Sequence, residues 1–482
     1  MENNKVRVRI APSPSGNLHV GTARTALFNY LFAKKSGGDF ILRIEDTDLE
    51  RSDDKYIQNI FDSLKAIGLN WDEGPEAGGE YGPYYQSQKF EIYQQYAKKL
   101  QVAGYAYECY CTQEELEQEK EASIANKHAH KYSGRCKNLS AEQIEQYKKE
   151  GRKPTLRFSV PQDRIISFDD IAKGHLEFDS NLIGDFVIMK SNGIPTYNFA
   201  VVADDIDMKM THILRGEDHI SNTAKQILIY EALGSKAPQF AHLGMILAPD
   251  RSKLSKRHGA TAVSEFIEQG YLPEAFVNFI ALLGWSPSDG VEIKNLEEII
   301  NDFDITRLSS SNSIFEFDKL NWMNGQYIRA MEIPALLERL KPYLTKYNLS
   351  EYTEEQLYKM VEVTREPLVL LSDITEAVSY FFGEDVEIEP EIQEKVLDTP
   401  TSQEVLKAFL DLAEQTECTE EAYHTVLEKL REEFKQKGIK PKDTMWAIRA
   451  SLTGRTRGAD MCAIIGLLGK DKILKRVKNA IK

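Results

Sequence analysis

A run near the amino terminus has residue types suited to holding phosphate groups. Residues 12–22 read Pro-Ser-Pro-Ser-Gly-Asn-Leu-His-Val-Gly-Thr. Gly16 and Gly21 allow the backbone to approach a ligand without a Cβ in the way. His19 can donate hydrogen bonds to phosphate oxygens on which negative charge develops. Alone, the run also fits a tight turn with a capping histidine.

A second run, far along the chain, supplies positive charge. Residues 253–257 read Lys-Leu-Ser-Lys-Arg. The ammonium groups of Lys253 and Lys256 can stabilise a leaving pyrophosphate as movable point charges. Alone, this run also fits a basic surface loop. Together, and in this order, the two runs predict one site that binds ATP with Mg²⁺.

The elements around the first run predict a nucleotide-binding unit. Residues 5–11 alternate apolar and charged side chains, which is typical of a strand. Apolar side chains recur at helical spacing over 22–35, and 39–45 contain a short apolar run that predicts a second strand. Strand, loop, helix and strand form a βαβ unit, whose ligands bind at the carboxyl ends of the strands.

A second region with the same alternation of strands and helices begins near residue 194. Residues 196–203 form an apolar run that we interpret as a strand, and 211–215 predict another. A helix is expected over 219–233. The two regions are interpreted as halves of one doubly wound fold.

The segment between the two halves does not have this alternation of strands and helices. Residues 91–193 contain a charged helical stretch over 112–127 and short strands near 155–160 and 183–190. We interpret them as an inserted domain.

Beyond residue 330 the pattern is almost wholly helical. Amphipathic segments run over 333–347, 353–381, 401–415 and 419–437, and the acidic stretch 383–394 is interpreted as a hinge. The expected domains are a split catalytic domain (1–90 and 194–249), the insertion (91–193), a domain with the lysine loop (250–330) and two helical bundles (331–390 and 391–482).

Composition sets the broad class. The chain has 482 residues, 42% of them hydrophobic, and a formal net charge of −15, which is typical of a soluble multidomain protein. No apolar run is long enough to span a membrane, and the five cysteines are too few for a disulfide framework, so we expect a cytoplasmic protein. Any contact with nucleic acid must use local basic patches such as 470–482.

Several runs together resemble the bacterial glutamyl-tRNA synthetases, a family of class I aminoacyl-tRNA synthetases. The two phosphate-binding runs are similar to the "HIGH" and "KMSKS" elements of that class. Further similar runs lie at 9–14, 43–48, 195–200, 214–218 and 322–325. The resemblance covers essentially the whole chain. It implies ligation of L-glutamate to tRNA(Glu), with glutamyl-adenylate as the intermediate, His19, Lys253 and Lys256 stabilising the phosphates, and a monomeric enzyme.

The residue chemistry agrees with glutamate as the substrate. A carboxylate side chain calls for a guanidinium partner, and Arg9 and Arg215 stand at the ends of predicted strands. Tyr197 offers a hydroxyl donor, and Glu45 is a natural partner for an ammonium group. By resemblance these four residues and Ser13 line the glutamate site. Alone, the charged run around Glu45 also fits a solvated strand end.

The resemblance places further residues on ATP. Asp218, His219 and Ile246 fall where relatives hold the nucleotide, together with Gly16, Gly21 and Lys256.

Three cysteines within the insertion suggest a metal site. Cys109, Cys111 and Cys136 can ligate zinc with a fourth nitrogen or oxygen ligand. Some relatives bind structural zinc with this spacing and use tyrosine or histidine as the fourth ligand. Asn138 stands where some of them have histidine, so Tyr132 is the better candidate, and His128 and His130 are alternatives. Cys418 and Cys462 lack partners in the sequence and are expected to be buried apolar residues.

The helical half resembles the anticodon-binding part of the same family. Arg449 belongs to one similar run, and lysines at 435, 437, 440 and 442 can contact phosphates. Relatives that charge only tRNA(Glu) tend to have an arginine that reads the last anticodon base. Here Pro367 aligns with that position and Arg365 precedes it by two residues, which favours an enzyme that also charges tRNA(Gln).

Three other classes share part of this pattern. A truncated paralogue that glutamylates a modified tRNA base lacks the helical half, and metabolic nucleotidyltransferases are usually much shorter. A non-catalytic RNA-binding protein has no need for both His19 and Lys256. The whole pattern therefore favours a tRNA ligase.

Overall fold

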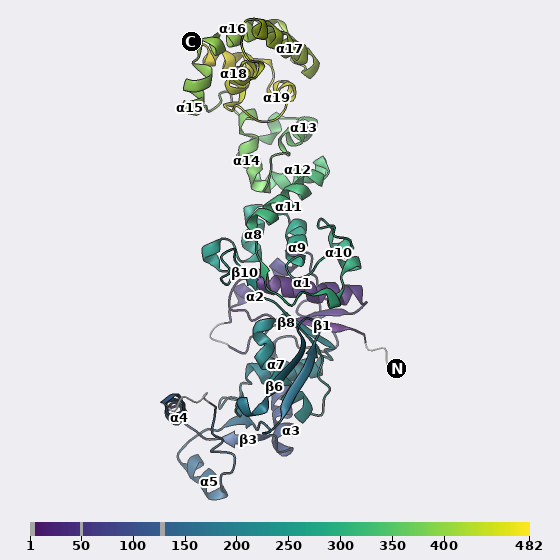
Figure 1. Ribbon diagram of the computed structural model, residues 1–482, viewed down its shortest axis with the longest axis vertical. Coiled ribbons are helices and arrows are strands. Elements are labelled where there is room, and N and C mark those ends of the chain that lie inside the picture. The colour runs from purple at the N-terminus through teal and green to yellow at the C-terminus, as the bar shows by residue number, and fades with distance from the viewer. Residues whose placement is uncertain (1–4, 49–51, 126–130) are drawn as a thin grey trace. The chain divides into compact units, whose positions relative to one another are not determined.

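The computed structural model describes residues 5–48, 52–125 and 131–482, whose elements are drawn in Figure 1. They form two compact units, one made of residues up to 267 with 276–317 and the other of 268–275 with 318–482. Within these described ranges, no helix has both the length and the apolar content that a membrane span requires. The domain boundaries expected from the sequence stay predictions.

Parallel strands form the centre of the first unit. β1 (Arg7–Ile10) pairs with β2 (Asp39–Leu42), and β8 (His212–Gly216) pairs with β9 (Gln239–Leu243). The two pairs join where the backbone N–H of Thr211 donates to the carbonyl of Arg7 at 3.0 Å. This sheet confirms three predicted strands, and it brings the carboxyl ends of four strands to one edge.

The helices that connect these strands also follow the sequence pattern. α1 (Val20–Lys35) links β1 to β2, and α7 (Ile220–Ala232) links β8 to β9. Both helices are buried around most of their circumference, and the apolar residues whose spacing predicts α1, such as Ala23 and Leu27, lie in the core.

The strand predicted over 196–203 is wrong, because these residues begin a helix. α6 (Tyr197–Asp207) starts after Thr196, whose Oγ1 donates to the carbonyl of Val187 at 2.8 Å. Its apolar residues are buried on every side. A short continuous apolar run is found in buried helices as well as in buried strands, so this pattern does not distinguish the two. The β-branched residues favoured the strand interpretation, but packing against α7 and its neighbours decides the outcome.

The insertion contains two sheets. β3 (Ala106–Cys109), β4 (Thr155–Phe158) and β7 (Phe186–Met189) form one antiparallel sheet, which confirms the two predicted strands. The hairpin of β5 (Ile165–Asp170) and β6 (Gly174–Asp179) was not predicted. Its strands alternate apolar and polar side chains, but each has only two apolar residues at alternate positions, and β5 ends in two aspartates. It pairs in parallel with β9 and so joins the catalytic sheet.

Smaller elements complete the first unit and the segments that border it. They are α2 (Asp54–Ala66), α3 (Phe90–Val102), α4 (Gln113–Ala125), α5 (Ala141–Lys149), α8 (Val263–Gln269), α9 (Pro273–Ala281), α10 (Leu296–Asp302), β10 (Ile246–Leu247) and β11 (Ser313–Ile314). α4 confirms the helix expected over 112–127.

The second unit is helical, as predicted, and α16 to α19 gather around one core at the green-to-yellow end of Figure 1. Its helices are α11 (Phe317–Ala330), α12 (Ile333–Leu340), α13 (Glu354–Thr364), α14 (Ile374–Ala377), α15 (Pro390–Ile392), α16 (Pro400–Gln415), α17 (Glu420–Gln436), α18 (Pro441–Thr453), α19 (Met461–Leu468) and α20 (Lys470–Ala480).

Two predicted helices of this unit are interrupted. α12 ends before Pro342, and α13 ends before Pro367, because proline lacks the N–H that continues a helix. The predicted helix over 353–381 is therefore one helix followed by short turns. The stretch 383–394, interpreted as a hinge, is held at its start by Arg476, whose guanidinium donates to the carbonyls of Gly383 and Glu384.

Candidate active site

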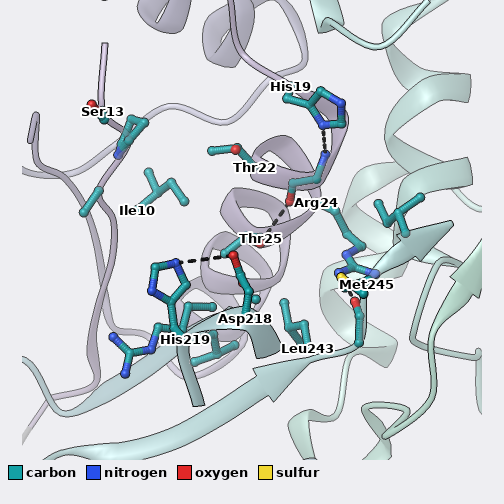
Figure 2. Close-up of a pocket in the computed structure, with 18 of the residues that line it drawn as sticks. Ile10, Ser13, His19, Thr22, Arg24, Thr25, Asp218, His219, Leu243 and Met245 are labelled. Carbon is teal, nitrogen blue, oxygen red and sulfur yellow. Dashed lines mark hydrogen bonds and ion pairs between the residues drawn. The ribbon is translucent and has the colours of Figure 1, made fainter. Parts of the chain in front are cut away.

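A cavity of about 590 Å³ lies at the carboxyl edge of the parallel strands. Figure 2 shows His19 on one side of it and Asp218 with His219 on the other. The structure brings together eleven of the residues that the sequence singles out: Arg9, Ser13, His19, Gly21, Glu45, Tyr197, Arg215, Asp218, His219, Ile246 and Lys253. Gly16 and Lys256 are absent from its lining.

His19 stands where the backbone enters α1. Its Nδ1 accepts a hydrogen bond from the backbone N–H of Gly21 at 3.1 Å, and it caps the helix. An accepting Nδ1 leaves the proton on Nε2, so that nitrogen is a donor. Burial, reinforced by the charge of Lys253, lowers the pKa of His19 below its ordinary value. The side chain is therefore a neutral donor at the positive end of a helix dipole.

Arg215 ends β8 and is almost fully buried. Its Nη2 donates to Thr223 Oγ1 at 2.6 Å and to Gln226 Oε1 at 2.8 Å, and its Nε donates to His242 Nε2 at 3.3 Å. A guanidinium has five N–H donors, of which these bonds use three. Nη1 is buried and has no partner among the described residues. Arg215 itself lines the cavity, so a ligand bound there is the candidate acceptor for these two donors.

Arg9 lies next to the end of β1 and is fixed by a buried carboxylate. Its Nε lies 3.2 Å and its Nη2 3.5 Å from the two carboxylate oxygens of Asp205. Arg43 Nη1 donates to the same carboxylate at 2.7 Å. Burial alone raises the pKa of Asp205, but Arg9 and Arg43 more than offset it and hold the pKa below its ordinary value.

Glu45 follows β2 and faces the same cavity. Burial raises its pKa to about 7, against the opposing effect of Arg43 and Arg9. Arg43 is its nearest cation, with Nη2 at 3.4 Å from Oε1. A carboxylate that is costly to ionise in the empty site gains from a positively charged group of a ligand.

Tyr197 and His219 lie together on the far side of the cavity. Tyr197 Oη lies 3.0 Å from His219 Nδ1, and His219 Nε2 lies 3.9 Å from Asp218 Oδ2. Burial, followed by the charge of Arg215, lowers the pKa of His219 to about 4. The imidazole is thus neutral near pH 7. Although α6 was predicted as a strand, the first residue of this helix still reaches the expected site.

The lysine loop is only partly turned towards the cavity. Lys253 lines the cavity, while Lys256 is exposed in a short turn, Lys256–His258. His258 fixes this turn, because its Nδ1 accepts from the backbone N–H of Ser255 at 3.2 Å. The two lysines therefore have different relations to the site in this conformation.

Sequence reasoning missed four charged or polar residues that support the site. Asp205 holds Arg9, Asp170 and His242 lie behind Arg215, and Arg24 of α1 donates to the carbonyls of Leu283 and Gly244. Two adjacent aspartates after an apolar run were a usable signal for Asp205, because buried charges need partners. His242 and Asp170 had no local motif.

The three cysteines of the insertion converge as expected. The Sγ atoms of Cys109, Cys111 and Cys136 all lie within 4.8 Å of one another. Tyr132 Oη lies 3.4 Å from the Sγ of both Cys109 and Cys111. Asn138, by contrast, is exposed. The alternatives His128 and His130 lie outside the described residues.

The two remaining cysteines and the expected anticodon residues are spread over the second unit. Cys418 and Cys462 are partly buried rather than fully buried. Arg365 Nη1 donates to the carbonyl of Met331 at 3.3 Å, and Pro367 is exposed just after it. Arg449 Nη1 donates to the carbonyl of Ala459 at 2.7 Å.

Comparison with known proteins matches both units to described families. Residues 5–322 match "tRNA synthetases class I (E and Q), catalytic domain", and residues 335–481 match "Anticodon binding domain". A glutamate–tRNA ligase of Carboxydothermus hydrogenoformans is 49% identical over 479 residues, which are 98% of this chain and 99% of that protein. Another, from Desulforamulus reducens, is 46% identical over 99% of this chain and 100% of that protein.

Solved structures give the same result. The crystal structure of a glutamate tRNA ligase from Elizabethkingia meningosepticum, in complex with its amino acid, superposes with a TM-score of 0.92 at 35% identity and covers 99% of both chains. The chain therefore belongs to the class I tRNA synthetases for glutamate and glutamine, and within them to the family of glutamate–tRNA ligases. This result confirms the fold class and the activity class expected from the sequence.

Proposed function

We propose that the cavity binds L-glutamate and ATP side by side and joins them. Arg9 and Arg215 bind the side-chain carboxylate of glutamate, Tyr197 and Ser13 contact it, and Glu45 pairs with its ammonium group. The observation that carries this proposal is Arg215 Nη1, a buried guanidinium nitrogen without a partner among the described residues, at the edge of a cavity. A buried donor of this kind is costly unless a ligand accepts from it.

The phosphates of ATP fit at the start of α1. The first turn of this helix has no acidic residue, and its N–H groups and dipole favour an anion. A Cβ on Gly21 would meet only the His19 ring, at 3.6 Å, so the protein itself leaves room there. Any larger side chain would enter the cavity that Gly21 lines. We therefore assign the phosphates to His19 and Gly21, and the rest of the nucleotide to Asp218, His219 and Ile246.

The reaction is proposed to proceed in two transfers. An oxygen of the α-carboxylate of glutamate attacks the α-phosphorus of ATP, and the bond from this phosphorus to pyrophosphate breaks. His19 Nε2 and Lys253 stabilise the charge that develops on the phosphates. Asp218 offers carboxylate oxygens that would suit Mg²⁺, which would add positive charge on the phosphates when it is bound with ATP.

The second transfer passes glutamate to tRNA(Glu). The terminal ribose hydroxyl attacks the carbonyl carbon of the adenylate, and the bond to AMP breaks. No enzyme nucleophile is needed, because positioning and electrostatics supply the rate enhancement. Lys256 lies outside the cavity lining, so its contribution requires the loop to take another position when ATP is bound.

The cysteine cluster is proposed to hold structural zinc. Three thiolates and one phenolate oxygen give the four ligands that zinc prefers, and sulfur is its common donor. The guanidinium of Arg157 lies 3.9 Å from the centroid of the Tyr132 ring and balances negative charge there. The donor set thus fits Cys109, Cys111, Tyr132 and Cys136 as ligands.

Metal analysis of protein purified without chelator tests the zinc assignment. We expect about one equivalent of zinc in the wild type and a loss of it in Cys136→Ser. Cys462→Ser is the matched control, because this cysteine lies outside the cluster, and its zinc content should equal the wild type's. A wild-type protein without zinc would refute the assignment.

The tRNA scope is proposed to include tRNA(Gln) as well as tRNA(Glu). Pro367 is exposed where relatives specific for tRNA(Glu) tend to have an arginine, and the guanidinium of Arg365 already donates to the carbonyl of Met331. Arg449 is assigned to the anticodon region. We further propose that the enzyme is a cytoplasmic monomer.

Charging of the two purified tRNAs side by side tests both the function and its scope. Glutamate should be attached to tRNA(Glu) and to tRNA(Gln), and Pro367→Arg should reduce the second reaction more than the first. Charging of tRNA(Glu) alone would restrict the scope, while charging of neither would refute the function. Sedimentation of the same sample tests the monomer.

A further inference from the structure

A buried aspartate and histidine lie directly behind Arg215. His242 on β9 and Asp170 at the end of β5 are both fully buried, and His242 Nδ1 lies 2.6 Å from Asp170 Oδ2. The backbone N–H of His242 also donates to both carboxylate oxygens, each at 3.1 Å. Asp170 belongs to the insertion, whereas His242 belongs to the catalytic sheet. The pair thus connects the inserted hairpin to the edge of the active site.

The hydrogen-bond partners of His242 determine which of its ring nitrogens carries the proton. Burial alone raises the pKa of Asp170, but the hydrogen bonds from His242 outweigh it and lower the pKa, so Asp170 is a charged acceptor. Nδ1 of His242 must therefore carry a proton. Burial lowers the pKa of His242, which makes the ring neutral and leaves Nε2 as an acceptor. That acceptor faces two donors, Nε of Arg215 at 3.3 Å and the hydroxyl of Thr223, whose Oγ1 lies at 3.0 Å and itself accepts from Nη2 of Arg215.

The remaining contacts of Arg215 complete the arrangement. Thr223 and Gln226 accept from Nη2, so the plane of the guanidinium is fixed along two of its edges. Without the acceptor on His242, the guanidinium can turn about its terminal bonds and Nη1 loses its fixed direction. An arginine recognises a carboxylate through geometry as well as charge, so a turned guanidinium binds it less well.

We propose that Asp170 and His242 are positioning residues that aim Nη1 of Arg215 at the side-chain carboxylate of the amino-acid substrate. Asp170 selects the proton position of His242, and His242 orients Arg215. The pair thereby contributes to the choice of glutamate over its neutral amide. This inference rests on the proposed contact between Arg215 and the substrate.

Two variants of His242 separate orientation from packing. In His242→Asn, the amide nitrogen matches Nδ1 and keeps the bond to Asp170, but nothing replaces Nε2. In His242→Gln, the amide oxygen can occupy the position of Nε2 and accept from Arg215. We expect His242→Asn to raise the KM for glutamate about tenfold to a hundredfold with an unchanged KM for ATP. His242→Gln should stay near the wild type in both constants.

Discrimination between glutamate and glutamine is a second measurement, which a change in packing alone would not alter. The ratio of kcat/KM for glutamate to that for glutamine should fall in His242→Asn and be restored in His242→Gln. Equal effects of the two variants, no effect of either, or equal changes in the constants for glutamate and ATP would overturn the proposal.

A spectroscopic measurement on the wild type does not depend on whether the variants fold. Nitrogen-15 NMR of histidine-labelled protein should show a neutral His242 with a protonated Nδ1 and an unprotonated Nε2. A proton on Nε2 would overturn the proposal. The assumed contact is tested separately, since Arg215→Ala with an unchanged KM for glutamate would refute that contact while leaving the histidine tautomer as found.

Discussion

Nδ1 of His19 accepts the backbone N–H of Gly21 at 3.1 Å, and this single bond assigns two tasks to one side chain. The acceptor caps α1, and the opposite nitrogen, Nε2, becomes a donor beside the cavity. Capping and the proposed catalytic role can be tested separately because they use different atoms of the ring. We therefore expect substitutions that replace one ring nitrogen of His19 at a time to affect helix stability and activity separately.

Substitutions of His19 should separate these tasks. In His19→Asn the amide oxygen can still cap α1, but no group replaces Nε2, so we expect kcat to fall on the order of a hundredfold to a thousandfold without a change in Tm. His19→Gln keeps a donor near Nε2 and loses the cap, so it should retain more activity at a lower Tm. Steady-state kinetics and thermal unfolding measure both. Equal activity in the two variants would contradict this division.

Glu45 should make glutamate binding depend on pH near neutrality. Its pKa is raised to about 7, so the carboxylate is lost as pH falls through 7. In the proposed contact the ammonium group of the substrate pairs with the ionised form, so the KM for glutamate should rise about fivefold between pH 7 and pH 6. The pKa of His219 is lowered to about 4, so this residue adds no transition in the same range, and burial moves the transition of His19 towards lower pH.

Two comparisons check that this pH dependence belongs to Glu45. The KM for ATP should not follow the same curve, and Glu45→Gln should have a high KM for glutamate that no longer changes between pH 6 and pH 8. A wild-type KM that is flat over this range would contradict the assignment.

Lys256 should matter for turnover although it lies outside the cavity lining. Lys256→Ala is expected to reduce aminoacylation by a factor on the order of a hundred or more with the fold intact, because a cation near the departing pyrophosphate is lost. Arg257→Ala is the matched control in the same exposed turn, and its effect should be much smaller. Near-normal turnover in Lys256→Ala would remove this lysine from catalysis.

Asp205 should stabilise the fold as well as the site. It is buried between Arg9 and Arg43, and Asp205→Asn leaves two buried guanidinium groups with less compensation. We expect a loss of about 3–5 kcal/mol in the free energy of unfolding. Glu231→Gln, which breaks the half-exposed pair with Arg164, should cost about 0–1 kcal/mol. Urea unfolding compares them, and similar losses in both variants would contradict the account.

Much of the site could be predicted because its residues lie on local motifs. His19 and Gly21 share one loop, and Arg9, Glu45 and Arg215 lie near the carboxyl ends of predicted strands, so a parallel sheet brings them together without further information. The cysteines likewise converge from a short stretch. Local sequence was enough wherever one turn or one strand end positions the side chain.

The rest depended on contacts between distant segments. α6 has the apolar run of a buried strand, and only its surroundings make it a helix. Asp170 meets His242 across 72 positions of sequence, through a hairpin whose strands end in acidic residues. The apolar residues of this hairpin alternate, but that pattern does not indicate its partner, because tertiary pairing decides where Asp170 meets His242.

The most direct test of the central claim is the KM for glutamate in Arg215→Ala, measured by charging of tRNA(Glu) beside the KM for ATP. A buried guanidinium that binds the side-chain carboxylate should raise the KM for glutamate about a hundredfold when it is removed, with an unchanged KM for ATP. An unchanged KM for glutamate, or equal increases in both constants, would contradict the account.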